Sequence, residues 1–351
     1  MAGKLEAAGI QARVEHVQSP QLADAGGDLG YRVRAGQFAS KADGAPAVEQ
    51  IKAASYASSV LYTGWDGDAG TSRTTRGPWK LEVLTIDPKQ FRGQLTSGFG
   101  PNLQDRETTS QLAAGAGALA ATNGGYFDAT CTDPDEIVAF TQDFGPSTPS
   151  GPGLEVVLDE HGTVKAVNSS RGIPVPARGR TVQAIGTDVQ KLGSLAKIGT
   201  RLKIDAELVN EAGRPLQAGS TTDVVNGGPV LVSNGAENIT AKRDGMVRQG
   251  DSNSFYYGWV HKRNPRTIAG VDAQGRTLLV TADGRQTTAL GLSIKESADV
   301  ARSLGMVDAI NLDGGGSTTM VVNGQVVNSP SDAAGQRPVG DALLVLPRRR
   351  D

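Results

Sequence analysis

The sequence contains one cysteine, Cys131, and only three histidines, His16, His161 and His261. A single cysteine cannot form a disulfide within the chain. The histidines are widely separated and show no metal-ligand spacing, so we expect no zinc site built from cysteine and histidine. Any bound metal would be a hard cation, Ca²⁺ or Mg²⁺, held by carboxylate, amide and backbone oxygens.

Several other features are scarce. No apolar run is long enough to span a membrane as a helix. The formal net charge of −2 gives no reason to expect a nucleic-acid partner or an anionic membrane surface. Aromatic residues make up 5% of the chain, whereas there are 46 glycines, which favours turns and strands over a helical bundle. The nucleophile elbow G-x-S-x-G and the Walker A loop are both absent.

The most informative stretch is residues 291–328. Ser293 with Glu296 three positions later forms a capping box, which predicts that a helix starts there. The apolar run Met306–Leu312 has the length of a buried strand. Asp313 follows this run and three consecutive glycines follow Asp313, so a carboxylate stands at the edge of a loop that has almost no side chains.

Consecutive glycines allow a ligand to approach the backbone closely and to use its N–H donors. The loop therefore predicts a binding site with Asp313 as its carboxylate. The alternative is a tight turn with a solvated aspartate, because Asp-Gly is common turn chemistry. The apolar strand before the loop favours a site. Its predicted substrate-binding residues are Gly314, Gly315, Gly316, Ser317 and Thr318.

Two further glycine turns have related composition. The sequence NGGYFD occupies residues 123–128, and NGGP occupies residues 226–229. We expect these two turns and the DGGG loop to converge on one site, with amide, aromatic and carboxylate groups suited to a sugar. A hairpin turn with Tyr126 in the core is the alternative for the first turn. The predicted substrate-binding residues of the two turns are Asn123, Gly124, Gly125, Tyr126, Asn226, Gly227 and Gly228.

Five motifs in this order resemble the phosphodiester glycosidase family, and the resemblance covers roughly residues 80–347. They are NGGYFD, NGGPVLVSNG, NPRTIAGVDAQGRTLLVTADGR, NLDGGGSTTM and RPVGDALLV. The resemblance implies an enzyme that hydrolyses a sugar 1-phosphodiester to free sugar and a phosphomonoester. A phosphomonoester leaves readily, so help from a general acid should matter less than in other glycosidases.

The resemblance also suggests roles for individual residues. Asp313 would be the principal catalytic carboxylate and Glu296 the next candidate, although the capping box explains Glu296 without catalysis. Asp128 and Asp272 are reserve carboxylates. Arg266, at the edge of a predicted loop, would hold the phosphate together with the N–H groups of Gly314–Ser317. Asn123, Asn226 and Tyr126 would orient sugar hydroxyls.

Residues 1–65 read as a separate small domain. LEAAGIQARVEHV at 5–17 parallels IKAASYASSVLYT at 51–63, each predicting the end of a helix followed by a strand. With YRVRAGQFASKADG, this organisation resembles a SPOR-type repeat, which implies binding to peptidoglycan glycan strands. The alternative is a small packing domain without a ligand. We hypothesise that the chain begins inside the first repeat, after an upstream strand and an export signal, so we expect a secreted or cell-envelope protein.

The expected architecture is α+β. A largely antiparallel domain with a few helices spans 78–347, and 66–77 is a polar, glycine-rich linker after the N-terminal domain. Two other functions remain open. One is a glycoside hydrolase acting on a cell-wall glycan without phosphate. The other is a non-catalytic glycan-binding protein whose working part is the N-terminal region.

Overall fold

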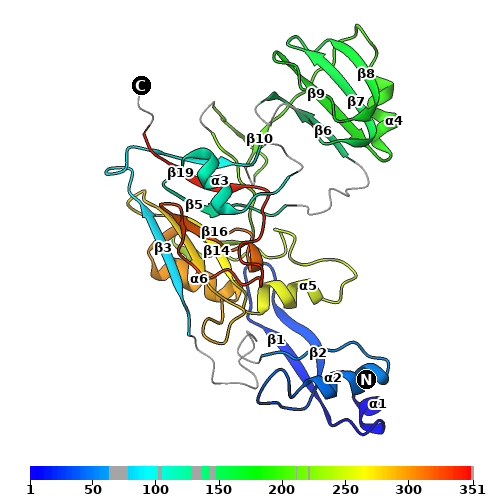
Figure 1. Ribbon diagram of the computed structural model, residues 1–351, viewed down its shortest axis with the longest axis vertical. Helices are drawn as coiled ribbons and strands as arrows, with labels where there is room; N and C mark the ends of the chain where they lie inside the picture. The colour runs from blue at the N-terminus through cyan, green and yellow to red at the C-terminus, as the bar shows by residue number, and fades with distance from the viewer. Residues whose placement is uncertain are drawn as a thin grey trace.

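The structure is a computed structural model (Figure 1). It describes residues 1–62, 78–101, 105–127, 136–142, 148–210, 212–219 and 222–348. The reserve carboxylate Asp128, Cys131 and the predicted linker lie outside these residues. Within them, no helix has the length and apolar character needed to cross a membrane.

The N-terminal part has two helices and a two-stranded antiparallel hairpin. Its elements are α1 (Ala2–Ala7), β1 (Ala12–Ser19), β2 (Gly27–Ala35) and α2 (Ala45–Ala53). One face of the hairpin packs on the helices around Leu5, Ile10 and Ile51. The strand predicted at 58–63 is wrong, because residues 58–62 form no strand.

The central layer is a six-stranded sheet whose neighbouring strands are all antiparallel. Its order is β13 (Ala236–Glu237), β12 (Val230–Ser233), β16 (Met306–Asn311), β14 (Arg266–Asp272), β15 (Thr277–Ala282) and β3 (Leu81–Ile86). The strand predicted at 306–312 is confirmed. Strands β14 and β15 form a hairpin that turns at Gln274-Gly275.

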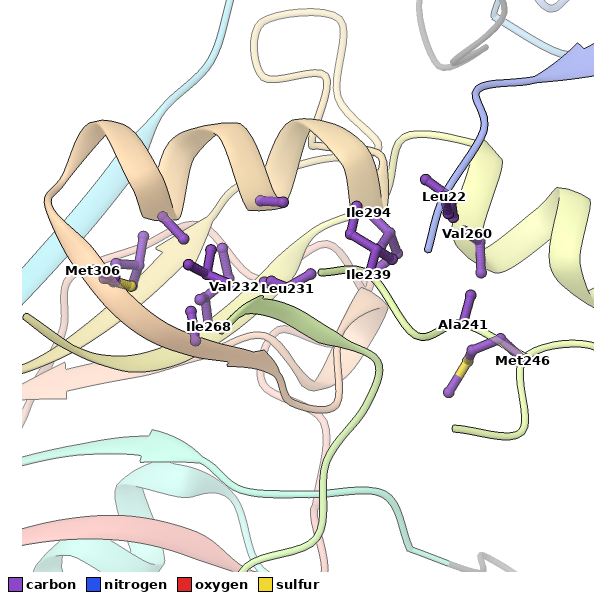
Figure 2. Close-up of a cluster of buried hydrophobic side chains, with 14 of the residues drawn as sticks. Leu22, Leu231, Val232, Ile239, Ala241, Met246, Val260, Ile268, Ile294 and Met306 are labelled. Carbon is purple, nitrogen blue, oxygen red and sulfur yellow. The ribbon is translucent and has the colours of Figure 1, made fainter. Parts of the chain in front are cut away.

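Helix α6 (Ile294–Ser303) packs against one face of this sheet. Its capping box is present as predicted, with the Ser293 hydroxyl accepting from the Glu296 amide. Ile294, Ala298 and Ala301 enter the largest core, where they meet Val232, Ile268 and Met306 from the strands (Figure 2). The helical spacing of its apolar residues explains why this face of α6 is buried.

A five-stranded antiparallel sheet lies beside the central sheet. Its order is β18 (Gln325–Val326), β17 (Met320–Val322), β5 (Ala120–Asn123), β19 (Ala342–Leu346) and β4 (Gln94–Gly98). Leu279 of the central sheet packs here with Ala120, Met320 and Val345. The capped helix α3 (Thr109–Ala116) packs on this sheet and ends at Gly117 because that residue is left-handed.

A separate four-stranded antiparallel sheet lies at the opposite end of the molecule from the N-terminal part (Figure 1). Its order is β6 (Glu136–Phe140), β9 (Gly179–Ile185), β7 (Gly151–Asp159) and β8 (Val164–Arg171), covered by α4 (Asp188–Leu195). β10 (Leu208–Val209) and β11 (Pro215–Leu216) form a small hairpin.

Three short helical turns complete the fold. α5 (Ser254–Tyr256) runs directly into the π-helix η3 (Tyr257–His261), and the glycines after Asp313 form the 3₁₀ turn η4 (Gly315–Ser317). Antiparallel sheets with few helices confirm the predicted α+β class.

Candidate active site

The three predicted glycine turns meet at one place. The Asn123 side-chain amide donates to the backbone oxygen of Asp313 at 2.7 Å, which joins the first turn to the third. The Tyr126 amide donates to Asn226 Oδ1 at 2.6 Å, and Asn226 Nδ2 donates back to the Tyr126 oxygen at 2.9 Å. The predicted convergence is therefore confirmed, although the turns come from distant parts of the chain.

Asn123 is fully buried at the end of β5. Its Oδ1 accepts from the Thr267 hydroxyl at 2.7 Å and from the Thr319 amide at 3.2 Å, while its Nδ2 donates to backbone oxygens. These bonds occupy both polar atoms of the Asn123 side chain. Asn123 therefore holds the loops together, and its predicted contact with sugar hydroxyls is wrong for this arrangement.

The Tyr126 hydroxyl is the centre of a second network. It donates to the Gly228 oxygen at 2.7 Å, and it accepts from Trp259 Nε1 and Asn311 Nδ2, each at 3.0 Å. Burial raises the pKa of the Tyr126 hydroxyl to about 12. Tyr126 and Asn226 join the turns through these bonds, and their role in orienting sugar hydroxyls stays a prediction.

Close packing requires glycine at both positions of the first turn, 124 and 125. A side chain on Gly124 would overlap the carboxylate of Asp341, and one on Gly125 would overlap Asn226. In the NGGP turn, the Gly227 backbone lies against Asn311 and Leu312, and the Gly228 oxygen accepts from Asn311 Nδ2 at 2.9 Å. These glycines let the polar side chains of neighbouring turns approach the backbone.

Asp313 is partly buried where the turns meet. Its Oδ1 accepts from the Gly314 amide at 2.9 Å. Burial raises the pKa of the Asp313 carboxyl, whereas the Ser317 hydroxyl, the Gly314 amide and the charges of Arg337 and Arg285 oppose that rise. The Asp313 carboxylate is thus partly shielded from solvent and lies near positive charge.

Asp341 is a second carboxylate that the sequence analysis did not select. Its Oδ1 accepts from the Gly125 amide at 2.9 Å. Gly124 lies between the two aspartates, because its amide donates to the Asp341 oxygen and its oxygen accepts from the Asp313 amide, at 3.0 and 3.2 Å. Burial raises the pKa of Asp341, and the charge of Asp313 raises it further. The sequence signal that could have identified Asp341 is its position, a charged residue directly before the apolar strand of RPVGDALLV.

Two arginines flank the glycine loop, and neither was predicted from the sequence. A side chain on Gly315 would come within 2.9 Å of Arg285 Nη2, and one on Gly316 would overlap the guanidinium of Arg337. Arg285 is exposed and has a positive φ of 58°. Strained backbone of this kind occurs at binding and catalytic sites. Arg337 also pairs with Asp332 at 2.8 Å.

The amides of the glycine loop are mostly used within the protein. Gly314 donates to Asp313, Gly315 donates to the Pro265 oxygen at 2.9 Å, and Ser317 donates to the Gly314 oxygen at 3.2 Å. The side chains of Ser317 and Thr318 are buried. The prediction that the amides of Gly314–Ser317 hold a phosphate is therefore wrong for these three.

Arg266 lies where the loop meets the strand, as predicted, because it is the first residue of β14. It is nevertheless completely buried. Nε donates to the Leu292 oxygen at 2.9 Å, Nη2 donates to the oxygens of Trp259 and Lys262, and the guanidinium lies 4.7 Å from the Trp259 ring centroid. Burial lowers its pKa to about 10. A two-pronged phosphate clamp at Arg266 is incompatible with these contacts.

Two other predicted carboxylates have structural roles. Glu296 pairs with Arg263 at 2.5 Å and accepts from the Ser293 amide at 2.9 Å, so the capping box explains it. Asp272 lies at the opposite end of β14 from Arg266, where it accepts from Arg276 Nε at 2.6 Å and from two turn amides. Both carboxylates are therefore paired with an arginine.

Among the residues that the structure describes, no group of three or more His, Cys, Asp or Glu side chains is placed to hold a metal ion.

Comparison with known proteins places this site in a family. Residues 152–346 match the phosphodiester glycosidase family and residues 1–62 match the SPOR domain. The chain is 46% identical over 74 residues to the mouse N-acetylglucosamine-1-phosphodiester alpha-N-acetylglucosaminidase, which is 21% of this chain and 14% of that enzyme. The human enzyme is 35% identical over 102 residues, covering 29% of this chain and 20% of the enzyme.

The chain thus spans less than a quarter of the length of these relatives. A crystal structure of a candidate exported protein from Burkholderia pseudomallei is similar over 99% of this chain and 88% of that one, with 29% identity and a TM-score of 0.82. The family match covers more than half of the residues, including the NGGP turn, the glycine loop and Asp341. The chain belongs to the phosphodiester glycosidase family.

Proposed function

We propose that the protein is a hydrolase that cleaves the glycosidic bond of a sugar 1-phosphodiester. The observation that carries this proposal is the partly buried Asp313, which lies next to a second carboxylate and beside two arginines where three glycine turns converge. Family membership and the names of the mouse and human relatives support it.

In the proposed reaction, water attacks the anomeric carbon of the sugar. The bond from that carbon to the bridging oxygen breaks, and its electron pair leaves with the phosphomonoester. Asp313 stabilises the positive charge that develops on the sugar ring. Asp341 takes a proton from the attacking water, since a carboxylate whose pKa is raised by burial is a better base.

The phosphate needs positive charge that faces the substrate. Arg285 and Arg337 replace Arg266 in this role, because both lie against the glycine loop next to Asp313. Arginine binds phosphate oxygens through two N–H groups at once. Arg266 instead supports the site from inside by binding the Trp259 oxygen.

The SPOR match suggests where this reaction takes place. A peptidoglycan-binding domain and the likeness to a candidate exported protein support a secreted or cell-envelope enzyme that acts on envelope glycans. The same match favours a second candidate function, hydrolysis of a cell-wall glycan without phosphate. In that case Arg285 and Arg337 would be dispensable.

The test is product analysis on a synthetic diester in which a sugar 1-phosphate is linked to the 6-hydroxyl of a second sugar. We expect free reducing sugar and a sugar 6-phosphate from the wild type. Asp313→Asn should lose about 10²- to 10⁴-fold in rate, whereas the control Asp272→Asn, at the far end of β14, should keep it. Sugar 1-phosphate as product, or full activity in Asp313→Asn, would contradict the proposal.

A further inference from the structure

The loop between β1 and β2 inserts into the larger part of the protein. Leu22 is 6% exposed and belongs to the same core as Ile239 and Val260 (Figure 2). The Ala23 amide donates to the Ile239 oxygen at 3.2 Å. The N-terminal domain is therefore packed against the rest of the chain and not only joined to it through the 63–77 segment.

Asp24, in the same loop, holds a turn that supports the NGGP motif. Its two carboxylate oxygens accept from the amides of Lys242 and Arg243, at 3.0 and 2.8 Å. The next residue, Asp244, accepts from the Val230 amide at 2.8 Å. Val230 directly follows the NGGP turn, so the loop supports one of the three turns of the site.

Further contacts reach α5 and the π-helix η3 that follows it. The Ser19 hydroxyl bonds to the hydroxyl of Tyr256, the last residue of α5, at 2.9 Å in a buried position. Arg32 of β2 donates to the Tyr257 hydroxyl, and its guanidinium lies 5.5 Å from the centre of that ring. Glu15 of β1 holds Arg32 in place, since Arg32 Nε donates to it at 2.7 Å. The first turn of η3 is thus fixed from the N-terminal domain.

The same π-helix carries a residue of the site. Trp259 Nε1 donates to the Tyr126 hydroxyl, and the Trp259 backbone oxygen accepts from the buried Arg266. Single π-helical turns are frequent at functional sites. The contacts of Arg32 with Tyr257 are therefore linked, through the backbone of η3, to the contact of Trp259 with Tyr126, which joins the glycine turns.

We propose that the N-terminal domain is a structural part of the catalytic centre, with Arg32 as a positioning residue that acts through Tyr257 to fix Trp259 against Tyr126. This inference rests on the proposed function. A glycan strand held by the domain would then lie at a fixed orientation to Asp313, so the substrate bond lies on or beside that strand. A domain on a flexible tether would impose no such relation.

The test uses the full chain and a small soluble sugar phosphodiester. Arg32→Ala should lower kcat by about 10- to 100-fold, as expected for a small displacement of site residues, with KM changed less than about 3-fold. The matched control is Arg13→Ala. Arg13 binds the same Glu15 at 2.9 Å, and its side chain is 42% exposed. It should keep wild-type kcat.

Tyr257→Phe keeps the ring and removes only the hydroxyl, so it should lower kcat in the same direction. It also replaces Arg32→Ala if that variant fails to fold. The double variant should be no slower than the slower single variant, because both changes break the same contact, between Arg32 and the Tyr257 hydroxyl. Wild-type kcat in both single variants would overturn the inference.

Hydrogen exchange gives a readout that does not depend on activity. Amides of residues 257–261 should exchange faster in Arg32→Ala than in Arg13→Ala or the wild type. If the wild type does not hydrolyse the diester, the proposed function fails, and the exchange result alone decides whether the domain fixes η3. Equal exchange in all three proteins would overturn the inference.

Discussion

Replacement of Tyr126 by phenylalanine tests the network that joins the glycine turns. The change removes one hydroxyl and keeps the ring, which packs edge-on against Trp259 with 6.1 Å between centroids. Three hydrogen bonds are lost. Gly228 keeps a donor, because Asn311 Nδ2 lies 2.9 Å from its oxygen, and Asn311 Nδ2 also keeps the Leu312 oxygen at 2.6 Å.

The group that loses its partner is therefore Trp259 Nε1. A buried donor left unpaired costs about 1–3 kcal/mol, and the lower part of that range applies because Trp259 is only partly buried. We expect the free energy of unfolding to fall by about 1–2 kcal/mol. The midpoint of thermal unfolding should fall by about 2–8 °C.

High pH supplies an independent check. Because the pKa of Tyr126 is raised from 10.0 to about 12 in the folded protein, the neutral hydroxyl stabilises the fold below pH 10. That stability is lost as the pH rises through about 12. A shift of this size corresponds to about 2–3 kcal/mol. The wild type should therefore lose its advantage over Tyr126→Phe between pH 10 and 12.

Urea unfolding of both proteins, followed by tryptophan fluorescence from pH 8 to 11.5, measures this difference directly. The two stabilities should differ by about 1–2 kcal/mol at pH 8 and converge as the pH rises. A difference that stays constant with pH would refute the assignment of the buried hydroxyl. A variant as stable as the wild type at pH 8 would refute the network itself.

Three further predictions concern the charged groups. Burial raises the folded-state pKa of Asp313, so the fold loses stability as the pH rises from the ordinary carboxyl value to the raised one. Asp313→Asn should therefore be more stable than the wild type at pH 7, and acid unfolding curves should show no difference at low pH, where both side chains are neutral. Arg337→Ala should raise KM for the diester at least about 10-fold through loss of a phosphate contact, and the exposed turn control Arg276→Ala should leave KM unchanged in the same assay. Asp341→Asn should lower kcat by about 10²-fold or more, and steady-state kinetics with a wild-type rate would remove Asp341 from the reaction.

Features set by short-range signals were predictable from the sequence. The capping box at Ser293 fixes the start of α6, and the hairpin turn at Asn323-Gly324 joins β17 to β18. Both depend on residues within a few positions of each other. The convergence of three glycine turns was predicted from their shared composition, which reflects the close approach of side chain and backbone that each one needs.

The remaining features depend on distant parts of the chain. Arg266 looks like a loop-edge residue in sequence, and its burial arises from the Leu292 and Trp259 oxygens that surround it in the fold. The importance of Asp341 appears only when β19 lies beside β5 and brings the carboxylate to Gly125. Asp272 shared the family motif but stands at the far end of its strand, which motif order alone does not reveal.

The central claim is that cleavage occurs between the sugar carbon and the bridging oxygen. Hydrolysis of the synthetic diester in water enriched in ¹⁸O, with mass analysis of the phosphomonoester, tests it most directly. Attack on the sugar leaves every phosphate oxygen in place, so the phosphomonoester should contain no ¹⁸O from the water. A phosphomonoester that has gained one ¹⁸O atom would show attack at phosphorus and would contradict the roles given to Asp313, Asp341, Arg285 and Arg337.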